Sequence, residues 1–179
     1  MKTTQILIAG FGGQGILFSG KFLAYKGLME DLQVSWLPSY GPEMRGGTAN
    51  CNVILSDDPV GSPIITEPDI LIAMNLPSLL KYVNTVTPGG QIYLDSSLID
   101  AKVEREDVEV FYLPATQLAK DNEISTLANM IMIGHVLENN SELSFAGTEA
   151  VVQKLVPASK QALVGLNMKA LSLGKEYKA

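Results

Sequence analysis

Short apolar runs, each bounded by glycine, proline or polar residues, recur along the first two thirds of the chain. Such runs, rich in β-branched residues, are typical of strands that are buried on both faces. They predict strands at residues 4–9, 34–37, 48–55, 69–74, 91–95 and 108–113. In 48–55 apolar and polar residues alternate, so Cys51, Val53 and Leu55 share one face while Asn50 and Asn52 point the other way.

Helical periodicity separates these runs and dominates the end of the chain. Apolar residues at spacings of three and four predict helices, here at residues 13–30, 76–83, 115–121, 126–138, 147–155 and 157–177. Strands that alternate with helices indicate an α/β fold: a doubly wound, Rossmann-like, mostly parallel sheet with helices on both faces, followed by a helical C-terminal part. No linker divides the sequence, so we expect residues 1–179 to form one domain.

The first predicted strand runs into a glycine-rich turn, Gly10-Phe11-Gly12-Gly13-Gln14-Gly15. G-x-G-x-x-G between a strand and a helix is the dinucleotide-binding fingerprint, in which backbone N–H groups at the helix start face a phosphate. An NAD site also needs a carboxylate at the end of the second strand, where this chain has Leu37 followed by Pro38-Ser39-Tyr40. A nicotinamide cofactor is therefore disfavoured. A phosphate-bearing ligand and a purely conformational turn both remain open.

A second loop, residues 38–47, follows the second predicted strand. Because the carboxyl ends of parallel strands meet at one edge of a sheet, we expect this loop to lie beside the glycine turn. It carries Tyr40, Glu43 and Arg45, the last directly before Gly46 and Gly47. An arginine beside two glycines is suited to hold a phosphate or carboxylate with two hydrogen bonds. The alternative is a surface ion pair between Arg45 and Glu43, which would contribute little.

The charge and hydropathy of the chain exclude several classes of function. Its net charge is −6, from 13 basic and 19 acidic residues with no basic run, which argues against nucleic-acid binding. No stretch approaches the roughly 18 apolar residues of a membrane span, and the first residues lack a signal-peptide pattern. A cytoplasmic protein without a membrane association is therefore expected.

Three further residues have plain structural interpretations. Cys51 is the single cysteine, so the chain forms no internal disulfide and does not ligate an iron–sulfur cluster alone. His135, the single histidine, lies in an apolar helix and is interpreted as a packed residue rather than a catalytic or metal-binding one. Asp95 ends a predicted strand, and both a pocket-facing carboxylate and a helix cap fit that place.

Both glycine-containing segments resemble those of a known family, the gamma subunit (or gamma domain) of 2-oxoacid:ferredoxin oxidoreductases. The matching segments are Gly10-Phe11-Gly12-Gly13-Gln14-Gly15 and, in the same order as in the family, Ser39-Tyr40-Gly41-Pro42-Glu43-Met44-Arg45-Gly46-Gly47-Thr48-Ala49. The likeness covers essentially the whole chain, including strand 69–74 followed by Asn75 and the Gly89-Gly90 turn. The GFGGQG form is more similar to the 2-oxoglutarate type than to the pyruvate type.

This resemblance implies a complex that converts a 2-oxo acid and coenzyme A to acyl-CoA and CO2 while reducing ferredoxin. The implied partners are alpha and beta subunits, a ferredoxin-like delta subunit and ferredoxin itself. Thiamine diphosphate, magnesium and iron–sulfur clusters are implied on the other subunits. This chain has one cysteine and no G-D-G…N diphosphate–magnesium motif, which agrees with that division.

By the same resemblance this chain helps to bind coenzyme A and to close the active site, is not active alone, and supplies no catalytic residue or metal ligand. The candidate coenzyme-binding residues are Gly10, Gly12, Gly13, Gln14, Gly15, Tyr40, Glu43, Arg45, Gly46 and Gly47. Two alternatives remain: a stand-alone nucleotide- or phosphate-binding enzyme, and a purely structural interaction subunit. The leucine- and methionine-rich helices near the C-terminus also offer a surface for a homodimer.

Overall fold

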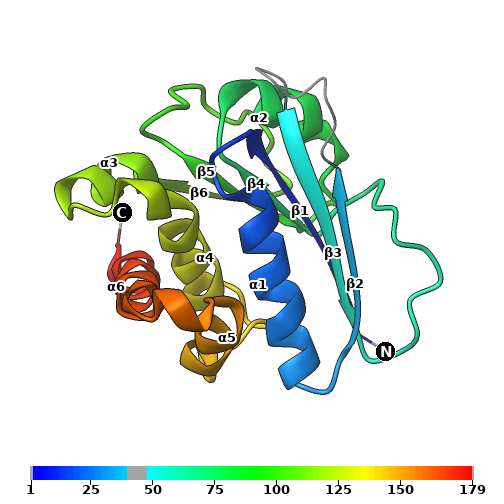
Figure 1. The fold of residues 1–179 in the computed structure, drawn as a ribbon. Coiled ribbons are helices and arrows are strands. Elements are labelled where there is room, and N and C mark those ends of the chain that lie inside the picture. The colour runs from blue at the N-terminus through cyan, green and yellow to red at the C-terminus, as the bar shows by residue number, and fades with distance from the viewer. Residues whose placement is uncertain (1, 40–47, 179) are drawn as a thin grey trace.

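A six-stranded sheet organises the chain. The computed structural model describes residues 2–39 and 48–178, and its strand order is β2-β3-β1-β4-β5-β6 (Figure 1). The strands are β1 (Thr3–Phe11), β2 (Gln33–Ser39), β3 (Thr48–Ser56), β4 (Ile70–Ala73), β5 (Gln91–Asp95) and β6 (Glu109–Leu113). β1, β4, β5 and β6 pair in parallel, whereas β3 is antiparallel to both β1 and β2. Five strands therefore run in one direction and β3 opposes them, which confirms the mostly parallel sheet.

Helices cover both faces of this sheet, as predicted. They are α1 (Ile16–Met29), α2 (Leu76–Tyr82), α3 (Ala115–Asp121), α4 (Ala128–Asn139), α5 (Thr148–Leu155) and α6 (Ala162–Glu176), with single 3₁₀ turns η2 (Val83–Thr85), η3 (Ser125–Leu127) and η4 (Ala158–Lys160). α2 packs on one face, and α1 and α4 pack on the other, with α5 and α6 outside them (Figure 1). Within residues 2–39 and 48–178, no helix combines the length and apolar character needed to cross a bilayer.

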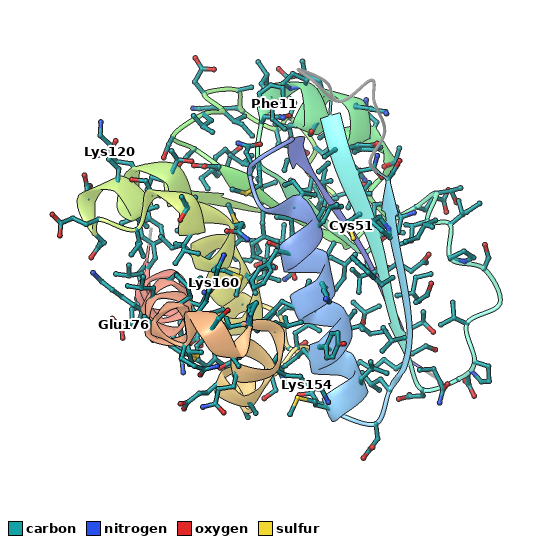
Figure 2. The ribbon with its side chains drawn as sticks, viewed as in Figure 1. Phe11, Cys51, Lys120, Lys154, Lys160 and Glu176 are labelled. Atoms are coloured by element: carbon teal, nitrogen blue, oxygen red, sulfur yellow. The ribbon has the colours of Figure 1, made fainter. Side chains whose placement is uncertain are left out.

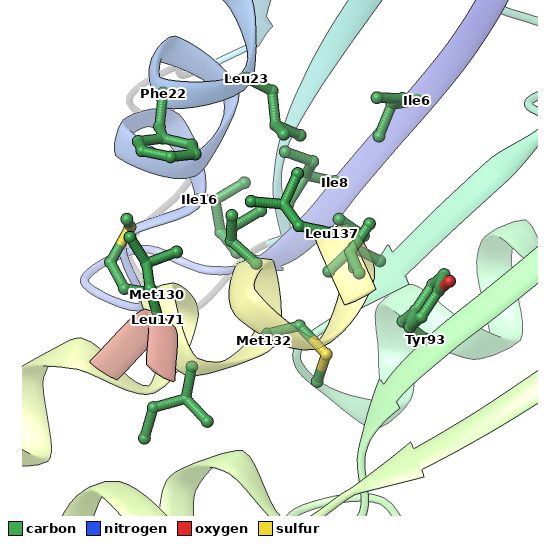
Figure 3. Close-up of a cluster of buried hydrophobic side chains, with 14 of the residues drawn as sticks. Ile6, Ile8, Ile16, Phe22, Leu23, Tyr93, Met130, Met132, Leu137 and Leu171 are labelled. Carbon is green, nitrogen blue, oxygen red and sulfur yellow. The ribbon is translucent and has the colours of Figure 1, made fainter. Parts of the chain in front are cut away.

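The pleat of the central strands divides the core into two clusters. On β1, Ile6 and Ile8 pack beneath α1 and α4, and Leu7 points to the opposite cluster around α2. Figure 3 shows the larger cluster, in which side chains from β1, α1, α4 and α6 meet. Because strands of this kind are buried on both faces, they consist of nearly continuous apolar runs. This is why those runs were a reliable signal for strands.

The hairpin of β2 and β3 is the feature that the sequence pattern did not predict. β3 lies between β1 and β2, so β2 is one strand further from β1 than a simple β-α-β unit would place it. Antiparallel neighbours need only a short connection, whereas parallel ones need a crossover. The two loops still begin at the same edge: Phe11 is in register with Thr48, and Ser39 with Asn50. The strands that flank the loop at 38–47 therefore end beside the glycine turn, while residues 40–47, on which the predicted proximity of the two loops depends, lie outside the described residues.

Candidate functional site

The turn between β1 and α1 depends on glycine for its backbone conformation. Gly13 has a φ of 94° and Gly15 a φ of 74°, both in the left-handed region that side-chain-bearing residues rarely adopt. Periodicity predicted a helix from residue 13, but α1 begins at Ile16. The three-residue difference follows from these two left-handed glycines, which an α-helix cannot include.

Gln14 closes this turn with both ends of its carboxamide. Its Oε1 accepts a hydrogen bond from the Phe11 N–H at 2.6 Å, and its Nε2 donates to the Met74 carbonyl at 2.9 Å. Gly10 makes room for the arrangement, because a Cβ there would lie 2.7 Å from Gln14 Oε1 and 2.9 Å from Met74 Cβ. The turn after β1 is thereby joined to the residue that follows β4.

Asn129 of α4 supports the same turn and was not identified from the sequence. Its side chain is only 4% exposed, and its Nδ2 donates to the Gly15 carbonyl at 3.2 Å and to Ser19 Oγ at 3.1 Å. A Cβ on Gly15 would lie 2.5 Å from that Nδ2, so close packing is a second reason for glycine at this position. The available signal was one asparagine directly before the apolar run of the helix at 126–138.

The first turn of α1 presents backbone donors at the carboxyl edge of the sheet. The first hydrogen bond of the helix runs from the Ser19 N–H to the Gly15 carbonyl at 3.0 Å, and Gly15 supplies no side-chain cap. The first N–H groups of a helix have no partner within the helix, and they carry the positive end of its dipole. Such a helix start attracts an anionic group.

A hollow of about 290 Å³ lies against this helix start. Phe11, which Figure 2 shows where β1 ends, is 38% exposed on its rim. The lining combines glycine backbone with apolar side chains, from Phe11, Gly12, Gly13, Gly15, Ile16, Leu17, Phe18 and Ala49. The arrangement offers N–H donors to an anionic group and apolar contacts to a neighbouring chain of carbon atoms.

The second set of candidate residues, Tyr40, Glu43, Arg45, Gly46 and Gly47, lies outside the described residues. Their flanking strands are described. Thr48 begins β3 in register with Phe11, and Ser39 ends β2 at the same edge of the sheet. The segment is thus attached beside the glycine turn.

Asp95 is a helix cap, which decides between its two interpretations. It is fully buried, and its Oδ2 accepts hydrogen bonds from the Thr116 N–H at 3.1 Å and from the Thr116 hydroxyl. Its Oδ1 accepts from the Ser97 N–H at 3.1 Å. Thr116 lies in the first turn of α3, so Asp95 satisfies a helix-start donor from a neighbouring strand.

Cys51 and His135 are packed residues, as predicted. Cys51 is buried, and burial raises the pKa of its thiol to about 12. A thiol that stays protonated at neutral pH is a poor metal ligand. His135 is 5% exposed, with Nδ1 3.1 Å from the Gly174 carbonyl oxygen, and burial lowers its pKa. The described part of the chain contains no cluster of three or more His, Cys, Asp or Glu side chains able to hold a metal ion.

Comparison with known proteins connects this geometry to one family. The family of pyruvate ferredoxin/flavodoxin oxidoreductases matches residues 5–177. The ketoisovalerate oxidoreductase subunit VorA of Methanothermobacter thermautotrophicus is 38% identical over 97% of this chain, which spans 36% of the length of VorA. The 2-oxoglutarate synthase subunit KorC of Methanothermobacter marburgensis is 34% identical over 96% of this chain and 95% of its own length.

Solved structures agree with these relatives. The gamma subunit of a keto/oxoacid ferredoxin oxidoreductase from Geobacter sulfurreducens superposes with a TM-score of 0.82 at 28% identity, covering 97% of this chain and 96% of its own. The 2-oxoglutarate:ferredoxin oxidoreductase of Magnetococcus marinus, solved with 2-oxoglutarate, coenzyme A and succinyl-CoA, superposes with a TM-score of 0.86 at 25% identity, over 98% of this chain and 31% of its own. On this evidence the chain belongs to the pyruvate ferredoxin/flavodoxin oxidoreductase family, and its assignment as a gamma subunit is confirmed.

Proposed function

We propose that the chain works in a 2-oxoacid:ferredoxin oxidoreductase complex that converts a 2-oxo acid and coenzyme A to acyl-CoA and CO2 and passes the electrons to ferredoxin. The match to the 2-oxoglutarate synthase subunit KorC and the likeness to a 2-oxoglutarate:ferredoxin oxidoreductase solved with 2-oxoglutarate support this acid as the substrate. Alpha, beta and ferredoxin-like delta subunits are the proposed partners.

The proposed role of this chain is to hold coenzyme A at the glycine turn and to help close the active site. The observation that carries this role is the uncapped start of α1 beside the hollow at Phe11. The N–H groups of this helix start suit an anionic group of the coenzyme, and Ile16, Leu17 and Phe18 suit its apolar portions. Coenzyme A supplies the thiol that receives the acyl group. Tyr40, Glu43 and Arg45, with Gly46 and Gly47, form the proposed second wall.

In this proposal thiamine diphosphate, magnesium and iron–sulfur clusters belong to the partner subunits. An iron–sulfur cluster requires several thiolates, and the single thiol of this chain, on Cys51, is buried with its pKa raised to about 12. No step of the reaction is therefore assigned to a metal or cluster on this chain.

Reconstitution tests whether the complex is the functional unit. The chain is expected to form a stable complex with subunits that contain thiamine diphosphate and iron–sulfur clusters, and to support 2-oxoglutarate-dependent ferredoxin reduction only within it. Turnover by the isolated chain would favour the stand-alone phosphate-binding enzyme instead.

The coenzyme role is tested in the assembled complex with Gly12→Val, which adds a side chain to a residue that lines the hollow, and with Arg45→Ala. Each is expected to raise the KM for coenzyme A by roughly tenfold or more, as the loss of a charge-assisted or well-packed contact does, with little change in the KM for the 2-oxo acid. Gly61→Val and Lys102→Ala are matched controls on exposed positions away from the turn. If the KM for coenzyme A and the turnover stay normal while assembly weakens, both loops are docking elements and the chain is a structural subunit.

A further inference from the structure

Strand β6 forms one edge of the sheet, and its backbone direction shows which of its groups are unpaired. The Glu109 N–H donates to the Gly90 carbonyl at 2.9 Å, and the Leu113 carbonyl accepts from the Ser96 N–H at 2.9 Å. Backbone groups of successive residues point alternately to the two sides of a strand. Odd-numbered residues of β6 therefore face β5, and the N–H and C=O groups of Val110 and Tyr112 face outward. In the described part of the chain no strand lies beyond β6.

A hollow of about 430 Å³ opens along this edge. Three consecutive residues of β6, Val110, Phe111 and Tyr112, line it together. Consecutive side chains of a strand point to opposite faces of the sheet, so one hollow that touches all three must reach the strand edge itself. Its other walls are the end of α4, the last turn of α6 and the two residues that follow α6. Figure 1 shows the C-terminal end of the chain on the β6 side of the molecule.

A cluster of packed aromatic rings forms the inner wall of this hollow. The His135 ring lies edge-on to Phe111 and to Tyr177, with centroid distances of 5.8 Å in both cases. Tyr93 stacks on Phe111 with centroids 4.5 Å apart. Burial lowers the pKa of His135, which favours the uncharged form of the ring. The wall therefore suits an apolar or aromatic side chain.

The rim of the hollow has the opposite charge balance to the protein as a whole. The chain has a net charge of −6, whereas the hollow carries Lys175 and Lys178 against one acidic side chain, Glu138. Lys175 also lies 4.6 Å above the ring of Phe145, and Lys178 is exposed. The two lysines outnumber the single carboxylate in this lining, so the surface is locally positive. A carboxylate-bearing partner complements it.

We propose that the outer edge of β6 and this hollow bind an extended acidic segment of a partner protein by strand addition. The segment exchanges main-chain hydrogen bonds with Val110 and Tyr112, places an apolar or aromatic side chain against Phe111 and Tyr177, and sets its carboxylates near Lys178. Recognition of this kind takes affinity from the main chain and specificity from the side-chain pocket. This surface lies away from the glycine turn and is independent of the function proposed there.

The test uses the full chain and a synthetic blocked hexapeptide of alternating valine and threonine with a central tyrosine and an aspartate at each end. A matched peptide carries lysine in place of aspartate. Titration is followed by NMR of the backbone amides, with hydrogen exchange as a second measurement. The acidic peptide is expected to bind at least about tenfold more tightly than the basic one and to protect the Val110 and Tyr112 amides from exchange.

Two variants separate main-chain from charge recognition. Val110→Pro removes an outward N–H without touching the β5 ladder, a substitution that edge strands tolerate, and is expected to weaken binding about tenfold or more. The double variant Lys175→Glu with Lys178→Glu should reverse the preference between the two peptides. It also tests the proposal if the proline variant does not fold. Lys160→Glu, on an exposed turn, is the control.

Several results overturn the proposal. These are no binding of either peptide, equal binding of both, or peptide binding that leaves the Val110 and Tyr112 amides unprotected. Protection of these amides without peptide, in a protein that sediments as a dimer, would show instead that a second copy covers this edge.

Discussion

The side chain of Gln14 hydrogen-bonds the main chain of Met74 across the edge of the sheet. Its Nε2 donates to the Met74 carbonyl at 2.9 Å, while its Oε1 accepts from the Phe11 N–H at 2.6 Å. One carboxamide thus holds the glycine turn in shape and attaches it to the end of β4. The backbone at the candidate site is positioned by this link and not by the turn alone.

Replacement of Gln14 tests this link. Gln14→Ala removes one acceptor and one donor, and we expect the free energy of unfolding to fall by roughly 1–2 kcal/mol, with faster hydrogen exchange of the Phe11 amide. Gln14→Glu retains an acceptor for the Phe11 N–H but loses the donor to Met74, so it should destabilise the protein while leaving that amide protected. Urea unfolding and exchange by NMR give both quantities. Unchanged exchange of the Phe11 amide in Gln14→Ala would contradict the proposed role.

The order of the elements could be predicted from the sequence because strands and helices leave different local patterns, short apolar runs in one case and helical periodicity in the other. Buried parallel strands are short apolar runs, and the predicted strands at 4–9, 69–74 and 91–95 lie on β1, β4 and β5. The ends of helices were predicted less accurately. The helix expected at 13–30 spans Ile16–Met29, because Gly13 and Gly15 adopt left-handed conformations. The direction of β3 was not predictable, since alternation reports which face a residue occupies and not which neighbours a strand selects.

The candidate site was only partly predictable for a related reason. The glycines of the turn form a local motif, and a local motif can be recognised in a single sequence. The contact of Asn129 with Gly15 joins residues 114 positions apart, and no periodicity reports such a pair. Asp95 was ambiguous because its partner, Thr116, is also distant in sequence.

The crossing of α4 and α6 gives a prediction about packing. A Cβ on Gly174 would overlap the Ile131 carbonyl oxygen, so Gly174→Ala must push the two helices apart. Overpacking of this kind costs about 1–3 kcal/mol. Gly165→Ala in the same helix is the control, because its Cβ would meet nothing within 4 Å, and it should stabilise the protein by about 0.5–1 kcal/mol. Urea unfolding measures both, and a destabilisation shared equally by the two variants would refute the packing argument.

The Cys51 thiol is predicted to be inert in the folded protein. With its pKa raised to about 12 by burial, its thiolate fraction at pH 8.5 is roughly a thousandfold below that of an ordinary thiol. Alkylation by iodoacetamide, followed by mass spectrometry, should therefore be slower by at least that factor in the native protein. Labelling in concentrated urea should proceed at the rate of a free cysteine. Rapid labelling of the native chain would show that Cys51 becomes exposed through local opening.

The lowered pKa of His135 predicts how the free energy of unfolding depends on pH. Burial lowers its pKa in the folded state below the ordinary value of 6.5, so in the range between the two pKa values the unfolded chain binds more protons than the folded one. The free energy of unfolding then rises with pH through this range and falls on acidification below pH 6.5, by up to about 1.4 kcal/mol per pH unit.

Comparing the wild type with His135→Gln checks both the sign of this pH dependence and its assignment to His135. Urea unfolding of each is measured at pH values from about 7.5 to 5.5, which span the ordinary pKa of histidine. The carboxylates contribute to both proteins, so subtracting the two profiles leaves the contribution of His135. We expect the wild type to lose stability faster than the variant as the pH falls. Parallel profiles would mean that His135 titrates alike in the folded and unfolded states, and that the ring is not kept neutral against Phe111 and Tyr177.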